Sequence, residues 1–200
     1  ERKKLFLNLL IGVCVLILIG LGVRWYFSYT ASQALAIYNH ALTDVSQPGD
    51  FEPKKAETAV KELEKLIQVY PGSKPARYAL LDLGNLDFLL KQYDKSQKAY
   101  ESFLNDLKPA EEPLKPLVLD SLANVYEAKG ELAKAASTWE KIVTGSDILM
   151  KPEAYLGLGR VYQALKQTEK SKKAYQDLIA MFPQSEKAIM AKVKLADLTK

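Results

Sequence analysis

One ten-residue sequence motif, called the repeated phrase below, occurs almost unchanged at two places in this chain of 200 residues. KQYDKSQKAY occupies 91–100, KQTEKSKKAY occupies 166–175, and seven of the ten positions are identical. A more divergent copy, GELAKAASTW, occupies 130–139 and keeps a small residue and an aromatic residue at the matching positions. The copies begin 39 and 36 residues apart, and periods of this length indicate an array of stacked helical repeats.

A second pattern precedes each copy. Leu followed by a small residue occurs at 83–84, 122–123 and 158–159. The third unit carries the fullest set of matching positions, which are Tyr155, Leu158, Gly159, Tyr162, Ser171, Tyr175 and Pro183. These residues resemble the tetratricopeptide repeat family, whose period is about 34 residues. The resemblance implies pairs of antiparallel helices, with small residues where two helices cross and large aromatic residues between neighbouring pairs.

We therefore expect an all-α fold, a tetratricopeptide-repeat α-solenoid with about three full repeats within 76–200. The excess over the family period is expected in the long connectors at 108–116 and 144–152. Glu111 and Glu112, in the first of these connectors, are interpreted as part of a solvated loop. The last segment, SEKAIMAKVKLADLTK, is predicted to be a capping helix whose exposed side carries Lys187, Lys192 and Lys194.

A partial repeat is predicted ahead of the array, as a helix pair within 30–75. Residues 54–71 show apolar side chains at helical spacing. These are Ala56, Val60, Leu63, Leu66 and Ile67. The partner helix is predicted at 31–45, and the turn-rich segment SQPGDFEP at 46–53 connects the two.

The longest apolar run is LFLNLLIGVCVLILIGLGV at 5–23, with Asn8 as its one polar side chain. As a helix, its 19 residues span roughly 28 Å, close to the thickness of a hydrocarbon core. Three basic residues precede it at 2–4, and an aromatic cluster follows at 25–29, as at a membrane–water interface. A soluble helix would carry a polar stripe, and the apolar region of a signal peptide is shorter, about 7–15 residues. We predict a retained membrane anchor within 1–29, a single transmembrane helix.

Charge predicts the orientation of this anchor. After the basic flank, Arg24 is the only charged residue before Asp44. The positive-inside rule then places the N-terminus in the cytoplasm and the repeats on the other side, which in a bacterium is the periplasm. We therefore expect a single-pass protein of the bacterial inner membrane. Because the printed sequence begins with Glu1, we expect leader residues ahead of it. No Gly or Pro lies between Val23 and Pro48, so the membrane helix is predicted to continue into the first helix of the domain.

The sequence offers little for catalysis. With one Cys (Cys14) and one His (His40), it excludes an internal disulfide and a multi-histidine metal site. His40 has Asp44 one helical turn away, and we interpret the two as surface residues because no nucleophile is identifiable beside them. A hydrolase that uses His40 is the weaker alternative. After residue 29 the chain carries 24 basic and 23 acidic residues, so charge gives no case for nucleic-acid binding. We predict no enzyme activity, no cofactor and no metal.

A surface for binding another protein remains. In the family that the chain resembles, the first helix of each unit lines a concave groove. By position, the groove residues are Tyr78, Leu81, Asn85 and Phe88 in the first unit, Leu117, Asp120, Asn124 and Glu127 in the second, and Glu153, Leu156, Arg160 and Gln163 in the third. Some members clamp a peptide carboxylate with paired Lys and Asn. Asn85 and Asn124 match the Asn places, but Leu81, Asp120 and Leu156 stand at the Lys places, so we expect no such clamp. For each groove residue the alternative is packing within the array.

The basic leader, the membrane helix, the segment RWYFSYTASQALAIY at 24–38 and the array together resemble the YfgM-like ancillary subunits of the Sec translocon. The resemblance implies partners in the translocon and in a periplasmic chaperone, and assistance to secreted chains. Our first hypothesis is a non-enzymatic, membrane-anchored adaptor of this kind. The alternative is a structural accessory subunit of another inner-membrane complex, held mainly through its transmembrane helix. Close helix packing there would be favoured by Asn8, Gly12, Gly20 and Gly22.

Overall fold

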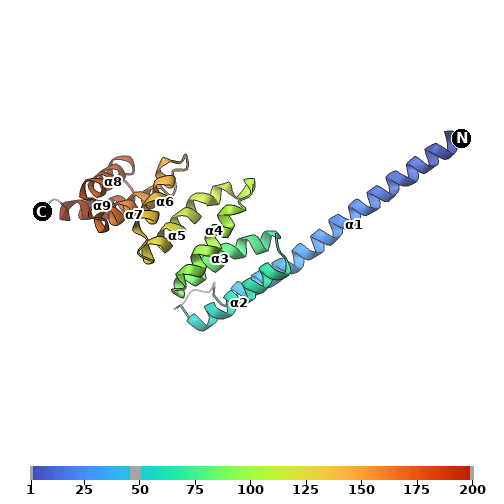
Figure 1. The fold of residues 1–200 in the computed structure, drawn as a ribbon, viewed down its shortest axis with the longest axis horizontal. Coiled ribbons are helices and arrows are strands. Elements are labelled where there is room, and N and C mark those ends of the chain that lie inside the picture. Colours follow the sequence, from blue (N-terminus) through green and yellow to red (C-terminus); the bar gives the residue numbers. More distant parts are fainter. Residues whose placement is uncertain (1, 46–50, 199–200) are drawn as a thin grey trace. The chain divides into compact units, whose positions relative to one another are not determined.

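Helices make up almost all of the described chain, which comprises residues 2–45 and 51–198 of a computed structural model (Figure 1). The helices are α1 (Arg2–Leu42), α2 (Pro53–Val69), α3 (Lys74–Leu89), α4 (Tyr93–Asn105), α5 (Lys115–Ala128), α6 (Leu132–Thr144), α7 (Lys151–Ala164), α8 (Thr168–Met181) and α9 (Glu186–Asp197), with a short 3₁₀ helix, η1 (Pro109–Leu114). No strand occurs in these described ranges, which confirms the predicted all-α fold. The chain divides into two compact units, Glu1–Ala79 and Leu80–Lys200.

The first unit is built on a long helix hairpin. As predicted, α1 continues without a break from the apolar run into the helix that packs on α2. Ala34 and Ala41 are buried on α1, and the buried face of α2 comprises Ala56, Ala59, Val60, Leu63 and Leu66. His40 Nδ1 lies 3.0 Å from Glu62 Oε2 of α2, so the exposed His40 pairs across the hairpin. Most of the predicted connector, residues 46–50, lies outside the described residues.

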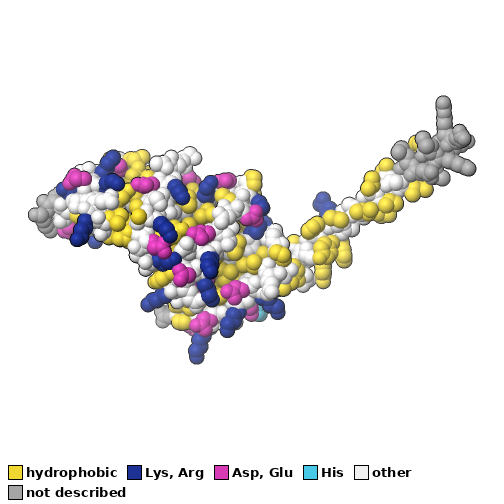
Figure 2. Space-filling model, in the orientation of Figure 1, with side chains coloured by type: hydrophobic (Ala, Val, Ile, Leu, Met, Phe, Trp, Pro, Cys, Tyr) yellow, Lys and Arg dark blue, Asp and Glu magenta, His cyan; other side chains and the backbone are white. Residues whose placement is uncertain are grey.

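Residues 10–23 of α1 are apolar on all sides of the helix. The helix is long and apolar enough to cross a membrane by length and composition, and none of its apolar window is buried. Figure 2 shows hydrophobic side chains along the visible face of this helix, whereas Lys, Arg, Asp and Glu side chains are interspersed over the visible face of the rest of the molecule. An exposed apolar surface of this length is what a lipid environment would cover.

The second unit contains the stacked helix pairs, and their packing explains the repeated phrase. Ser96 Oγ of α4 donates a hydrogen bond to Gly84 O of α3, at 2.7 Å, and both groups are buried. The Tyr100 ring lies against the same glycine, where a Cβ atom would overlap it. In the third pair, Ser171 Oγ donates to Gly159 O at 2.7 Å in the same way. The small residues of the phrase therefore let two backbones approach, and the aromatic residue covers the crossing.

In the middle pair, the small and aromatic residues are arranged differently. Ala123 stands where the other pairs have glycine. The Trp139 ring lies against Gly157 of the following repeat, 2.6 Å from the place where a Cβ atom on that glycine would be. Trp139 Nε1 also donates to Asp120 Oδ1 at 2.7 Å. The aromatic side chain of this pair therefore ties the second repeat to the third.

The turn between the two helices of each pair contains a residue with a left-handed backbone conformation. Lys91 and Lys166 both have φ 59°, and Gly130 has φ 76°. Beyond each of them the next backbone N–H reaches back across the helix end, as in the bond from Gln167 N to Tyr162 O at 2.8 Å. This pattern closes the helix by a Schellman motif, which satisfies carbonyls that would otherwise lack a partner.

Two predictions concern the first long connector and the capping helix. Glu111 is 5% exposed, and its Oε2 accepts a hydrogen bond from Lys108 N at 3.1 Å, so the expected solvated loop is wrong at this residue. Burial follows because η1 folds the connector back, and the carboxylate caps that turn. On the capping helix α9, Lys192 and Lys194 are exposed as predicted, and Ile189 is exposed as well. The third predicted residue, Lys187, is half-buried, and its Nζ lies 3.7 Å from Glu153 Oε1.

Candidate partner-binding surface

The first helices of two successive repeats share a hollow. Its volume is about 350 Å³. It is lined by Asn85, Phe88 and Leu89 of α3, Tyr100 of α4, and Ser121 and Asn124 of α5. Three of these six residues were predicted from the sequence to lie in a groove, namely Asn85, Phe88 and Asn124. The lining carries no ionisable carboxylate, amine or guanidinium, so the hollow combines apolar surface with neutral hydrogen-bonding groups.

Hydrogen bonds orient the two carboxamides. Tyr100 O–H donates to Asn85 Oδ1 at 2.6 Å. Asn124 Nδ2 donates to Asp120 O at 2.9 Å and to Asp120 Oδ2 at 3.1 Å. Burial raises the pKa of the Tyr100 phenol to about 12, so this group stays a neutral donor at physiological pH. Both amides are therefore held by neighbours within the array, which presents them in fixed positions.

Asp120 contributes to the packing of the array as well as to its surface. Its two carboxylate oxygens accept from Trp139 Nε1 and from Asn124 Nδ2. Burial raises the pKa of this carboxyl, and the hydrogen bond from Trp139 opposes that shift. A carboxylate at this place would repel the carboxylate of a peptide that approached it. At this place, where the clamp has a lysine, the chain therefore has a carboxyl group that is already bonded to Trp139 and Asn124.

Further along, the predicted residues pair with one another across the second and third repeats. Arg160 Nε donates to Glu127 Oε1 at 2.6 Å, and Arg160 Nη2 donates to Glu127 Oε2 at 2.5 Å. The hydrogen bond to Glu127 raises the pKa of the guanidinium. The same guanidinium lies 5.6 Å from the centroid of the Trp139 ring. Both charges are therefore engaged within the array in a fork-like geometry.

The remaining predicted residues lie in different surroundings. Leu156 is 9% exposed and belongs to a buried cluster with Tyr175 and Leu178, so it is a core residue. Gln163 is exposed, and Leu81 is half-buried against the core of the repeats. Tyr78 belongs to the first compact unit, where Lys74 Nζ lies 5.6 Å from the centroid of its ring.

Sequence reasoning missed three lining residues, Leu89, Tyr100 and Ser121. Tyr100 was interpreted as a packing residue, and it is one, but its hydroxyl also reaches the hollow. Leu89 is 53% exposed beside Phe88. In the sequence, its place next to Phe88 was the signal available for it. Ser121 follows Asp120 on α5 and had no distinguishing signal.

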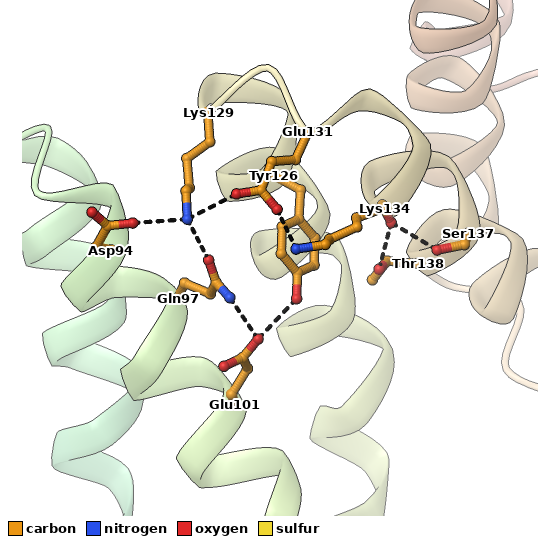
Figure 3. Close-up of polar contacts among 9 residues, drawn as sticks. All are labelled: Asp94, Gln97, Glu101, Tyr126, Lys129, Glu131, Lys134, Ser137 and Thr138. Atoms are coloured by element: carbon orange, nitrogen blue, oxygen red, sulfur yellow. Dashed lines mark hydrogen bonds and ion pairs between the residues drawn. The ribbon is translucent and has the colours of Figure 1, made fainter.

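A second polar region lies where the first and second repeats meet (Figure 3). Lys129 Nζ lies 2.8 Å from Asp94 Oδ1 and 3.0 Å from Glu131 Oε1. Nearby, Tyr126 O–H donates to Glu101 Oε1 at 2.8 Å. Figure 3 shows these side chains pointing toward one another from neighbouring helices, so they join the two repeats.

A larger hollow, of about 890 Å³, lies by η1 and the facing ends of α4, α5 and α6. None of the predicted groove residues lines it, and its rim includes the Glu112–Lys115 ion pair, at 3.4 Å. We base the candidate site on the smaller hollow because that one lies on the first helices of the repeats. Among the described residues, no group of three or more His, Cys, Asp and Glu side chains is placed to hold a metal ion.

Taken together, paired helices stacked through small residues and aromatic rings define a helical-repeat protein with a surface for other proteins. The sequence matches the model of the tetratricopeptide repeat-like domain over residues 4–200, and the chain belongs to that family. This fold is a scaffold for protein–protein interaction. No curated protein matches the chain significantly.

Solved structures show the same fold at low sequence identity. A tetratricopeptide repeat protein from Parabacteroides merdae is 15% identical, with a TM-score of 0.65, and the match covers 86% of this chain and 60% of that one. The chain thus spans less than two thirds of that protein's length. The MamA RS-1 ArsTM double mutant is 16% identical, with a TM-score of 0.58 and coverage of 85% and 94%. The first TPR of Spaghetti (RPAP3), bound to the HSP90 peptide SRMEEVD, is 22% identical, with a TM-score of 0.50 and coverage of 62% and 90%.

Proposed function

We propose that this chain is a non-enzymatic, membrane-anchored adaptor that binds a segment of a partner protein on the first helices of its repeats. The observation that carries the proposal is the hollow shared by α3 and α5, whose lining is apolar and neutral. An apolar anchor residue of a partner would fill it beside Phe88 and Leu89, and Asn85 and Asn124 would hydrogen-bond the partner's backbone.

The chemistry of the lining favours an uncharged partner segment. The Spaghetti domain is bound to a peptide with three acidic residues, SRMEEVD. Here no lysine or arginine lines the hollow, and Asp120 lies next to Asn124. An acidic peptide would lose its hydration without gaining a cation in return. We therefore propose a partner whose docking segment is apolar and neutral.

The same proposal includes a location. With the apolar run 5–23 in the bilayer and the basic residues 2–4 on the cytoplasmic side, the repeats would lie in the periplasm of a bacterium. There the adaptor would act near the Sec translocon, with a periplasmic chaperone as a partner, and would assist secreted chains. The flanking charge and the uncovered apolar surface of α1 support the membrane anchor and its orientation. The translocon and the chaperone are proposed from the resemblance of the segment 24–38 and the array.

The second candidate function is that of an accessory subunit held in another membrane complex through α1. The observation that favours it is again α1, because nothing within the described chain covers its apolar window. Another transmembrane helix could pack there as well as lipid could.

One crosslinking experiment separates the two candidates. A photo-crosslinking residue is placed at Leu89 in the hollow, at Leu16 in the apolar run, or at Lys98, an exposed residue of α4, as the control. After extraction in mild detergent, the captured proteins are identified by mass spectrometry. Capture of a specific protein from Leu89, and its loss on Phe88→Glu, is expected for the adaptor. Capture from Leu16 alone would refute groove binding and support the accessory subunit.

A further inference from the structure

A second hollow of about 350 Å³ lies in the first compact unit, away from the repeats' first helices. One wall comes from α1 and consists of four residues between Tyr26 and Ala31. The other wall is the end of α2 and the turn after it, residues 69–73. The hairpin brings these walls together because α2 runs back along α1, as the His40–Glu62 contact shows.

The α1 wall of this hollow begins directly beyond the apolar run. If residues 5–23 fill the hydrocarbon core, residues 26–31 lie about 5–12 Å past its edge, at about 1.5 Å per residue. The headgroup layer on each side of a bilayer is roughly 5–8 Å thick. The α1 wall would therefore begin in the headgroup layer, at Tyr26, and end beyond its outer edge, at Ala31. This step rests on the membrane anchor of the proposed function.

The side chains around the hollow suit that layer. Trp25, Tyr26 and Phe27 are 69%, 59% and 65% exposed, and Val69 on the facing wall is 52% exposed. Exposed aromatic rings next to an apolar span are typical of the membrane–water interface. Thr30 Oγ1 donates to Tyr26 O at 3.0 Å, so the donor of this hydroxyl is satisfied within the helix.

The local charge points to a phosphate-bearing surface. No Asp or Glu occurs in residues 2–43 or in residues 65–81, the two stretches that supply the walls. Arg24 lies two residues before Tyr26, where the α1 wall begins, and Lys74 follows the turn at 69–73 directly. Basic residues beside an apolar and aromatic surface favour the headgroups of phospholipids, above all anionic ones.

We infer that the turn at 69–73 docks on the bilayer beside the aromatic rim of α1, and that the hollow between them takes a phospholipid headgroup. The bilayer then contacts α2 as well as α1. Two points of attachment restrain the tilt of the hairpin at the membrane surface, which a single helix would leave free.

Depth measurements on the full chain test this inference. In a Cys14→Ala background, single cysteines at Pro71, Val69, Lys61 and Leu16 carry an environment-sensitive fluorophore, in vesicles of phosphatidylcholine and phosphatidylglycerol. Nitroxide lipids carry the quencher at the headgroup or along the acyl chain. Labels at Pro71 and Val69 are expected to lose fluorescence with the headgroup nitroxide. Lys61 is the matched control, because it is exposed on the same helix about two turns farther from the membrane.

The Leu16 label distinguishes the ways in which the test could fail. Quenching of Leu16 by the acyl nitroxide, with Val69 and Pro71 no more quenched than Lys61, would overturn the docked turn and leave the anchor intact. An unquenched Leu16 label would refute the anchor and the inference together. Val69→Cys leaves the turn's proline in place, so a folding defect of the Pro71 variant does not decide the outcome.

Discussion

The left-handed residue in the turn of each repeat gives the sharpest test of the packing described above. The second repeat has Gly130 there, with φ 76°, whereas the third has Lys166, with φ 59°. Both backbones make the same Schellman hydrogen bonds, for example from Lys166 N to Gln163 O at 3.0 Å. Exchanging the residue types, Gly130→Lys and Lys166→Gly, therefore changes the backbone preference and little else.

The magnitude follows from two opposing effects. A residue with a Cβ atom in the left-handed region costs about 1–2 kcal/mol. Glycine avoids this cost, but it destabilises the folded chain by about 0.5–1 kcal/mol, because its unfolded chain has greater conformational freedom. Nothing lies within 4 Å of a Cβ atom on Gly130, so no clash adds to the balance. We expect Gly130→Lys to lower the free energy of unfolding by about 0.5–1 kcal/mol, and Lys166→Gly to raise it by the same amount.

The assay is urea unfolding of the full chain in mild detergent, followed by tryptophan fluorescence in a Trp25→Phe background. Trp139 then reports alone, and at 1% exposure it senses the loss of packing. Lys192→Gly, in the exposed middle of α9, is the control, because there the same exchange should destabilise by about 1 kcal/mol. The reasoning is refuted if Lys166→Gly destabilises the chain as Lys192→Gly does, or if Gly130→Lys is without effect.

Three further predictions concern the packing within and between the repeats. Gly159→Val should destabilise the chain by about 1–3 kcal/mol in thermal unfolding, because the buried Tyr175 ring occupies the space; an unchanged midpoint would contradict this packing. Because burial raises the pKa of Asp120, the folded chain binds its proton more tightly, and the free energy of unfolding should fall as pH rises from the ordinary carboxyl pKa through the raised one. Asp120→Asn should flatten that slope in pH-dependent unfolding, and an unaltered slope would refute the assignment. A double-mutant cycle on Glu127→Gln and Arg160→Gln should give a coupling of about 1 kcal/mol or less that weakens with salt, since the pair is partly exposed; a coupling insensitive to salt would argue against this.

The architecture was predictable because its signals are local. A repeated spacing of small and aromatic residues defines each helix pair, and the helical period of apolar residues identified α2. The stretch from Val23 to Pro48 holds no breaker, and α1 is indeed one helix through Leu42. The fate of Glu111 was not predictable in this way. Its burial depends on the 3₁₀ turn of η1, which no periodic pattern in the sequence predicted.

The candidate site was predictable in part. Its position on the first helices follows from the repeat, and three of the residues predicted for the groove, Asn85, Phe88 and Asn124, line one hollow. That the hollow binds a partner stays a prediction. Leu156 stands at the place that Leu81 and Asp120 hold in their repeats, yet it is buried whereas those two are half-buried. Its neighbours Tyr175, Leu178 and Ala191 come from the two helices that follow, and a position within one repeat does not show how closely those helices cover it.

By itself, the sequence determined which segments are helices, how they pair, and that one of them is apolar enough for a membrane. Hydrophobic period, small residues and breakers act within one helix or between adjacent ones, so they can be read in order along the chain. Only the tertiary structure decided that Trp139 crosses to Gly157 and that Glu127 meets Arg160, 33 residues away. Such contacts depend on the spacing of the stacked helices, and that spacing is set by all the side chains between them together.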